Sequence, residues 1–507
     1  MEKRFFKYKL NFLGNFINHF FLMKIRSIKV NYALNLLRVV SGILFGIITM
    51  PYINKVLGAE SLGKVEYVNS IITYFLLLSS LGIPMYGLRE VAKIRNDSYK
   101  RTKLVLELLS ILGITTLISY IIIFGVILNL PYFFSYKELI IVLSTIILFT
   151  NFGAEWFYQG IEDQMFITIR YLIVRILSFV LLFVLVKNPD DYLWYAFIVI
   201  LSTVGANIFN ILYLKKYLDF KDISFKKLNL KQHLKPALTI FVGSISVSIY
   251  LQLDITILGT AKGDESVGYY VMANKLIRFV IAIVTTIGAV MLPRLANLLT
   301  TDKKAFYSLV ETALNYIMIF SIPSTFAFMV LAKDFTLLMG GSDFRESILT
   351  TQILSPIVTI VGLAYFLGYL VLFPLGKERI YTVSTIIAAV LSIILNLIFV
   401  RIYGHNATAS IAVFSEVIGV VFMIVLGKSV LQKINFFNKS ISIYIIGSLA
   451  ISILLFLLTS LLSSTELLIK VIIEISLAIL LFVLILYISK EKVFFEVVNM
   501  IKAKLKR

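Results

Sequence analysis

Residues 267–292 read VGYYVMANKLIRFVIAIVTTIGAVML, an apolar run whose only amide and charged side chains are Asn274, Lys275 and Arg278. A helix of this length crosses the ~30 Å hydrocarbon core of a bilayer, because it rises about 1.5 Å per residue. Helices satisfy their own backbone polar groups in lipid, which open strands cannot do. The run therefore predicts a transmembrane helix that carries two cations at membrane depth.

Comparable runs recur along the whole chain of 507 residues, which is 59% apolar and 15% charged with a mean hydropathy of +0.93. Soluble domains are about 25% charged, so this composition excludes a soluble enzyme. Cysteine is absent, which excludes disulfides, thiolate metal sites and thiol redox chemistry. We expect an all-α polytopic membrane protein with about fourteen transmembrane helices of ~21 residues each.

The basic residues predict the orientation of these helices. Lysine and arginine number 48 against 28 acidic residues, a formal net charge of +20. With a cytoplasmic N-terminus, 35 of these cations fall in inside segments and 8 in outside loops. This asymmetry follows the positive-inside rule and favours lipid contact over nucleic acid as the reason for the charge. Both termini are therefore predicted to be cytoplasmic.

An internal repeat with a shift of 205 residues is visible in the polar positions. Glu60-Ser61-Leu62-Gly63 matches Glu265-Ser266-Val267-Gly268 at this shift. Six spans separate the two copies, which predicts parallel repeats with the substrate site between two lobes that rock to give alternating access. The further landmarks at this shift are Asn69 with Asn274, Arg89 with Arg294, and Asp97 with Asp302. In addition, a Leu-Gly dipeptide is predicted to close the helix before each copy, Leu57-Gly58 and Leu258-Gly259.

The repeat and the apolar runs divide the chain into six predicted segments. The N-terminal segment is either an interfacial basic helix or a stretch before an alternative start at Met23. The segments are a basic cytoplasmic or interfacial N-terminus (1–29), an N-lobe with six spans (30–214), a basic cytoplasmic linker (215–235), a C-lobe with six spans (236–427), two further spans (441–489) and a basic cytoplasmic tail (490–507).

Polar side chains at helical spacing mark one span in each lobe as a candidate binding surface. Charged groups at span depth usually face a cavity or a partner, because exposure to lipid costs at least ~2.5–3.5 kcal/mol on insertion scales. Cations on both lobes suit a phosphate or pyrophosphate, although snorkelling or structural pairing is the alternative explanation. The candidate substrate-binding residues are Asn31, Asn35, Arg38, Asn274, Lys275 and Arg278.

Acidic residues within spans are candidates for ion coupling. Burial raises the pKa of a carboxyl group and a nearby cation lowers it, so an acid that changes partners can take up and release a proton. We assign this role to Asp254 and Glu416, with fixed ion pairs as the alternative. Asp254 is also the predicted partner of Lys275, and Lys470 with Glu474 is predicted to form a helix pair.

No cofactor or metal site is predicted. The three histidines, His19, His233 and His405, are scattered and have no metal-ligand spacing. The chain has no phosphate-binding loop, dinucleotide fingerprint or nucleophile elbow, so it carries no ATP site of its own. H⁺ or Na⁺ is the expected coupling ion.

Several separated blocks resemble the polysaccharide flippase family, the O-antigen and capsule repeat-unit translocases. They are Gly82-Ile83-Pro84 with Tyr86-Gly87-Leu88-Arg89-Glu90, Glu155-Trp156-Phe157-Tyr158-Gln159-Gly160, and the block from Asp254 through Leu258-Gly259 to Lys275-Leu276. The resemblance covers roughly residues 23–430, and it includes the candidates Asp254 and Lys275.

The resemblance implies the multidrug/oligosaccharidyl-lipid/polysaccharide exporter fold of two six-helix lobes plus two helices. It implies a bacterial inner-membrane protein that moves an undecaprenyl-pyrophosphate-linked oligosaccharide from the cytoplasmic to the periplasmic leaflet, driven by an ion gradient. Membrane lipids are expected partners, with polysaccharide polymerase or glycosyltransferases as candidate protein partners. The last two helices are candidates for lining the path of the lipid tail.

Three alternatives remain open from the sequence. A multidrug cation exporter has the same architecture, but its cavity should be dominated by acids and aromatics. A lipid II flippase has the same anionic lipid chemistry and differs in its sugar contacts. A membrane glycosyltransferase or polymerase is disfavoured, because the outside loops are short.

Overall fold

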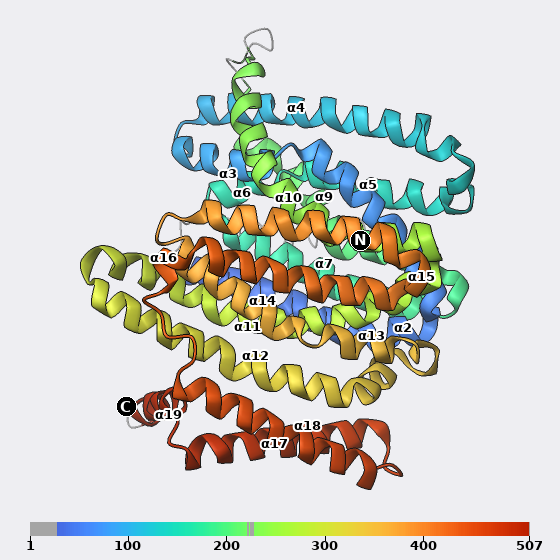
Figure 1. Ribbon diagram of the computed structural model, residues 1–507. Coiled ribbons are helices and arrows are strands. Elements are labelled where there is room, and N and C mark those ends of the chain that lie inside the picture. The colour runs from blue at the N-terminus through green and yellow to red at the C-terminus, as the bar shows by residue number, and fades with distance from the viewer. Residues whose placement is uncertain (1–27, 221–222, 224–227, 506–507) are drawn as a thin grey trace, which may run out of the picture. The chain divides into compact units, whose positions relative to one another are not determined.

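The protein is almost entirely helical, as its computed structural model shows (Figure 1). The structure describes residues 28–220, 223 and 228–505. No strand occurs in this part of the chain, and the predicted all-α polytopic fold is confirmed. The predicted N-terminal segment 1–29 lies outside the described residues except for its last two positions.

One compact unit comprises the described residues up to Gly46, in Ile72–Val186 and in Leu193–Ser244. Helices α3, α4 and α6 pack together around Leu108, Trp156 and Phe157, which are buried. The helices of this unit are parts of α2 (Ile28–Ser80), α3 (Ile83–Ile94), α4 (Ser98–Gly125), α5 (Lys137–Gly153), α6 (Glu155–Gly160), α7 (Gln164–Leu185), α8 (Tyr192–Ile200), α9 (Asn207–Leu214) and the first part of α10 (Lys231–Lys262).

The second compact unit comprises Ile47–Ile71, Lys187–Tyr192 and Ile245–Arg507. Within it, α17 and α18 pack on each other and on α12. Besides parts of α2 and α10, its helices are α11 (Asp264–Thr301), α12 (Lys303–Gly340), α13 (Ser347–Leu354), α14 (Ile357–Tyr365), α15 (Glu378–Leu426), α16 (Lys428–Leu431), α17 (Lys439–Leu461), α18 (Leu467–Ile488) and α19 (Lys492–Leu505).

The described helices are compatible with fourteen spans. Ten of them are long and apolar enough to cross a membrane, and the bent pair of α8 and α9 adds an eleventh. Helices α2 and α15 have 53 and 49 residues, and each is broken by a glycine with positive φ, Gly58 (71°) and Gly404 (60°). Each break leaves two parts of span length, because a span needs only ~20 residues. The exact count stays a prediction.

In the second copy of the repeat, the glycine that ends the first span is Gly263 and not the expected Gly259. Gly58 has φ 71° and ψ 179°, and Gly263, 205 residues later, has φ 81° and ψ −178°. The equivalent of Gly58 is therefore Gly263, and the pairing of Leu57-Gly58 with Leu258-Gly259 is wrong. A left-handed backbone favours glycine, which explains why this position has the same residue in both copies.

The aspartates of the repeat cap equivalent helices. Asp97 accepts a hydrogen bond from the backbone N–H of Lys100 at the start of α4. Asp302 accepts hydrogen bonds from the N–H groups of Lys304 and Ala305 at the start of α12. These side chains satisfy backbone donors that have no partner inside the helix. The 205-residue shift thus coincides with equal local structure.

Gly63 and Gly268 form a close crossing between the second part of α2 and α11. A Cβ atom on Gly63 would lie 1.8 Å from the carbonyl oxygen of Asp264, and one on Gly268 would lie 2.0 Å from that of Ala59. Ala59 and Asp264 are themselves 205 residues apart, so the contact is symmetric with respect to the repeat. Small residues allow helix backbones in a membrane to approach this closely.

We expect Gly63→Leu to destabilise the protein, because its side chain would collide with backbone that cannot rotate away. Overpacking of this kind costs about 1–3 kcal/mol or more, which thermal unfolding of the purified protein would detect as a lower midpoint. Gly46→Leu is the matched control on α2, since a Cβ there meets nothing within 4 Å. Equal midpoints for the two variants would contradict the close crossing.

Candidate functional site

Two arginines share one carboxylate in the first unit. Arg38 on α2 donates to Oε1 of Glu155, the first residue of α6, and Arg170 on α7 lies 3.5 Å from Oε2 of the same side chain. The chain turns at the buried Ala154, whose φ of 44° separates α5 from α6 and sets the position of Glu155. With all three groups ionised, the cluster keeps one uncompensated positive charge.

The two arginines of this cluster differ in accessibility. Arg170 is 4% exposed and donates to the carbonyl oxygen of Ala206 at 2.7 Å, which anchors it in the interior. Arg38 is 21% exposed and donates through Nη2 to Asn35 Oδ1 at 3.2 Å. Asn31 lies one turn earlier on α2 and is half-buried. Arg38 is therefore the accessible cation, with Asn35 beside it.

The predicted cations of the second unit are also close to acids. Lys275 on α11 forms an ion pair of 2.7 Å with Glu66 on α2, and its side chain is 44% exposed. The expectation that Lys275 is paired with an acid is correct, but the partner that the structure shows is Glu66 and not Asp254. Arg278 is exposed and donates through Nε to Asn274 Oδ1 at 3.1 Å, one turn back on the same helix.

Asp254 on α10 lies in a polar pocket within the second unit. Its carboxylate is 6% exposed and accepts hydrogen bonds from Ser392 (3.2 Å) and Asn396 (3.0 Å), one turn apart on α15. Tyr270 on α11 donates to the other oxygen at 3.3 Å. Neutral donors thus solvate a buried carboxylate, which would otherwise be costly to bury.

Glu416 lies near this pocket, on α15 beyond the break at Gly404. It is half-buried and close enough to Asp254 to interact with it electrostatically, as does Arg278. Two carboxylates with hydroxyl and amide oxygens around them offer the ligands that protons and hard cations prefer. Among the described residues, no group of three or more histidine, cysteine, aspartate or glutamate side chains is spaced to hold a metal ion.

Sequence reasoning missed several partners of the predicted residues. Glu155 was visible in a matching block, but its contact with Arg38 joins positions 117 residues apart. Ser392 and Asn396 are one turn apart, and this spacing was a usable signal for a polar helix face. Glu66 and Tyr270 gave no signal of their own.

A third charged cluster lies between α12 and α18. Lys470 Nζ lies 3.0 Å from each carboxylate oxygen of Asp334 and 3.8 Å from Glu474 Oε1. The predicted pair of Lys470 with Glu474 is therefore present only as the longer contact. The shorter one is with Asp334, which sequence spacing could not show because it lies 136 residues earlier.

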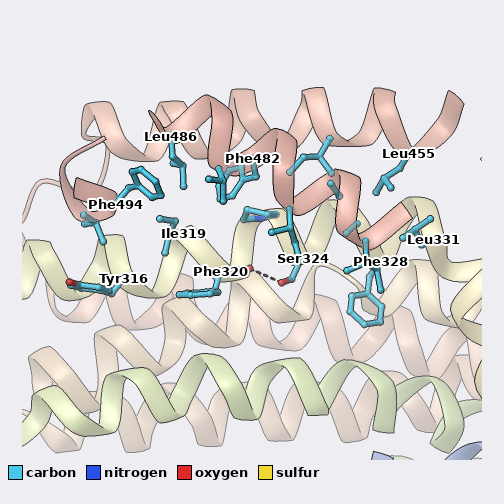
Figure 2. Close-up of a pocket in the computed structure, with 18 of the residues that line it drawn as sticks. Tyr316, Ile319, Phe320, Ser324, Phe328, Leu331, Leu455, Phe482, Leu486 and Phe494 are labelled. Carbon is cyan, nitrogen blue, oxygen red and sulfur yellow. Dashed lines mark hydrogen bonds between the residues drawn. The ribbon is translucent and has the colours of Figure 1, made fainter. Parts of the chain in front are cut away.

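An apolar groove runs along α12, α17 and α18 in the second unit (Figure 2). Its volume is about 520 Å³. Phe320, Phe328 and Phe482 are among its walls, and Ser324 and Tyr316 supply its few polar side-chain atoms. The groove thus lies where α17 and α18, which correspond to the last two predicted spans, meet α12.

Long apolar helices with buried, paired ionisable groups define a multi-pass membrane transporter. The sequence matches the polysaccharide biosynthesis protein family over residues 28–299, more than half of the chain. The chain belongs to this family. The relatives that it matches are described as transporters, in agreement with the prediction of a transporter and not an enzyme.

The relatives are bacterial membrane proteins of low identity. A Shigella dysenteriae protein described as "Putative O-antigen transporter" is 24% identical over 368 residues, which cover 71% of this chain and 90% of that protein. An Escherichia coli K12 protein of the same description is 19% identical over 355 residues, covering 70% and 86%.

Solved structures have the same fold. The inward closed lipid II flippase MurJ superposes with a TM-score of 0.68 and 16% identity, covering 90% of this chain and 99% of that one. An inward-facing multidrug transporter of the MATE family gives a TM-score of 0.58 and 16% identity, covering 77% and 94%.

Proposed function

We propose that the protein moves an undecaprenyl-pyrophosphate-linked oligosaccharide from the cytoplasmic to the periplasmic leaflet of a bacterial inner membrane by alternating access. The family and the O-antigen transporter relatives support this class of substrate. The observation that carries the proposal is the cluster of Arg38 and Arg170 around Glu155, because it leaves an accessible arginine and excess positive charge at span depth.

The chemistry of this cluster suits a migrating pyrophosphate. Arginine grips phosphate oxygens through two parallel hydrogen bonds, so a phosphate can replace the carboxylate of Glu155 beside Arg38. When the substrate leaves, Glu155 takes its place again and no bare cation remains in the membrane. Lys275 with Glu66 offers the same exchange in the second unit, and Arg278, which donates to the neutral Asn274, adds a second cation there.

We expect Arg38→Ala and Arg278→Ala each to slow flipping by about tenfold or more. A lost charge-assisted hydrogen bond costs about 1.5–3 kcal/mol, and 1.4 kcal/mol corresponds to a factor of ten. The measurement is translocation of a fluorescent polyprenyl-pyrophosphate oligosaccharide in proteoliposomes.

Two controls accompany this assay. Lys93→Ala removes an exposed cation that pairs only with the adjacent turn of α3, and it should flip at the normal rate. Arg38→Lys keeps the charge without the planar fork, and it should fall between the wild type and Arg38→Ala. Normal flipping in both alanine variants would refute the assigned site. Drug-cation efflux without lipid flipping would transfer the assignment to the multidrug exporters.

We further propose that Asp254 and Glu416 bind the coupling ion, H⁺ or Na⁺. Asp254 is buried and held by three neutral donors, so a change in the position of α10 or α15 would change the solvation of its charge. The ion would then be bound in one conformation and released in the other.

We expect Asp254→Asn to abolish accumulation driven by an ion gradient while leaving gradient-independent exchange of the labelled lipid. The amide keeps the shape of the side chain but cannot be charged. Transport in proteoliposomes with an imposed H⁺ or Na⁺ gradient measures both quantities and identifies the ion. Asp190→Asn, at an exposed acid outside the helices of the pocket, is the control. Full gradient-driven transport in both Asp254→Asn and Glu416→Gln would contradict the coupling role.

We also propose that the groove of α12, α17 and α18 accommodates the polyprenyl tail during transport. Its walls are mostly apolar, as an isoprenoid chain requires (Figure 2). The groove lies partly on α17 and α18, the two helices outside the repeat that are the sequence-based candidates for lining the lipid path.

We expect Ala327→Trp, which fills the groove, to reduce flipping of long-tailed substrate and to have less effect on a short-tailed analogue. Met329→Trp is the control on the same helix, because Met329 is 45% exposed and does not line the groove. The same proteoliposome assay with the two tail lengths provides the comparison. Equal rates for Ala327→Trp and Met329→Trp with the long-tailed substrate would remove the groove from the lipid path.

A further inference from the structure

Three ionisable side chains meet in the interior of the second unit, far along the chain from the residues assigned above. Asp334 belongs to α12, and Lys470 and Glu474 lie one turn apart on α18. Their side chains are 4%, 10% and 0% exposed. Charges buried this deeply must be neutralised by their neighbours.

Lys470 forms a hydrogen bond with only one of the two carboxylates, that of Asp334. Its ammonium group donates to Asp334 Oδ1 at 3.0 Å and lies 3.0 Å from Oδ2, whereas Glu474 Oε1 is 3.8 Å away, beyond hydrogen-bond distance. Neither oxygen of Glu474 has a hydrogen-bond partner, whereas both oxygens of Asp334 lie within 3.0 Å of the ammonium group. The cluster thus contains one carboxylate that the lysine neutralises and one that it does not.

Among the described residues, no ion pair joins a second cation to Asp334 or Glu474. On α12, the nearest other charge in sequence, Lys333, is exposed. On α17, the charged residue is Lys439, the first residue of the helix. This end of α17 is distant from the cluster, because Tyr444, one turn further along, hydrogen-bonds Glu491, which follows the end of α18 opposite to Lys470. Helix α19 begins only after that far end, at Lys492. Leu331 lies one turn before Asp334 on α12, Ala478 lies one turn after Glu474 on α18, and both are buried and apolar.

The charge balance follows from these contacts. One ammonium group and two carboxylates would leave a net negative charge in a pocket with no water-exposed side chain. A single proton on Glu474 removes this charge. It also turns Glu474, whose two oxygens have no hydrogen-bond partner, into a neutral acid.

We propose that Asp334, Lys470 and Glu474 form a proton-binding site in which Glu474 holds the proton and Asp334 stays ionised against Lys470. The site is separate from Asp254 and does not depend on the proposed substrate. The proton fastens α18 to α12 beside the apolar groove. Its loss would leave two carboxylates competing for one lysine and would weaken that attachment.

Infrared spectroscopy of the full-length protein in lipid nanodiscs at neutral pH tests this site. We expect a band of a protonated carboxylic acid that Glu474→Gln removes. In Asp334→Asn, Lys470 has only Glu474 left as an anionic partner, so Glu474 should ionise and the same band should disappear. Glu466→Gln, at an exposed acid that precedes α18, should leave the band unchanged.

The wild type alone gives a further measurement, which does not rely on any variant folding. Glutamate labelled with ¹³C at its side-chain carboxyl should shift the band if the protonated acid is a glutamate. A spectrum without a glutamate band would overturn the proposal, and so would a band that survives Asp334→Asn. A band that disappears when Na⁺ is added at constant pH would show a cation site instead. None of these outcomes involves lipid transport, so the site and the proposed function can fail separately.

Discussion

An ionised side chain is costly inside a bilayer unless a partner of opposite charge or several hydrogen bonds stabilise it. Four of the cations discussed above satisfy this condition. Arg38 and Arg170 lie against Glu155, Lys275 pairs with Glu66, and Lys470 lies against Asp334. A charged protein of this kind can transport an anion only if the substrate replaces an internal partner. Partner exchange is therefore the physical basis of the proposed mechanism.

The same constraint separates the three clusters by their charge. The Arg38 cluster has one positive charge in excess and suits an anion. The Asp254 pocket has a carboxylate held by neutral donors and suits a cation or a proton. The Asp334 cluster has one carboxylate too many and needs a proton to be neutral. Charge balance thus assigns a different ligand to each cluster without reference to any relative.

The backbone of the repeat is conserved more faithfully than its side-chain contacts. Gly58 and Gly263 have the same left-handed conformation, and Asp97 and Asp302 cap equivalent helices. The charged side chains, in contrast, do not follow the repeat, because the positions 205 residues away from Lys275 and Arg38 are Ser70 and Gly243. The repeat is thus visible in the helix ends and not in the charge pairs.

The sequence by itself determined the helical membrane fold, the repeat and the positions of the buried charges. These follow from hydrophobic length and periodicity, which are local properties of the chain. Only the tertiary structure decided which charges meet, since Glu155 lies 117 residues from Arg38 and Asp334 lies 136 residues from Lys470. Sequence spacing can pair residues on one helix face, as with Lys470 and Glu474. It cannot choose among acids on other helices, because that choice depends on how the helices pack.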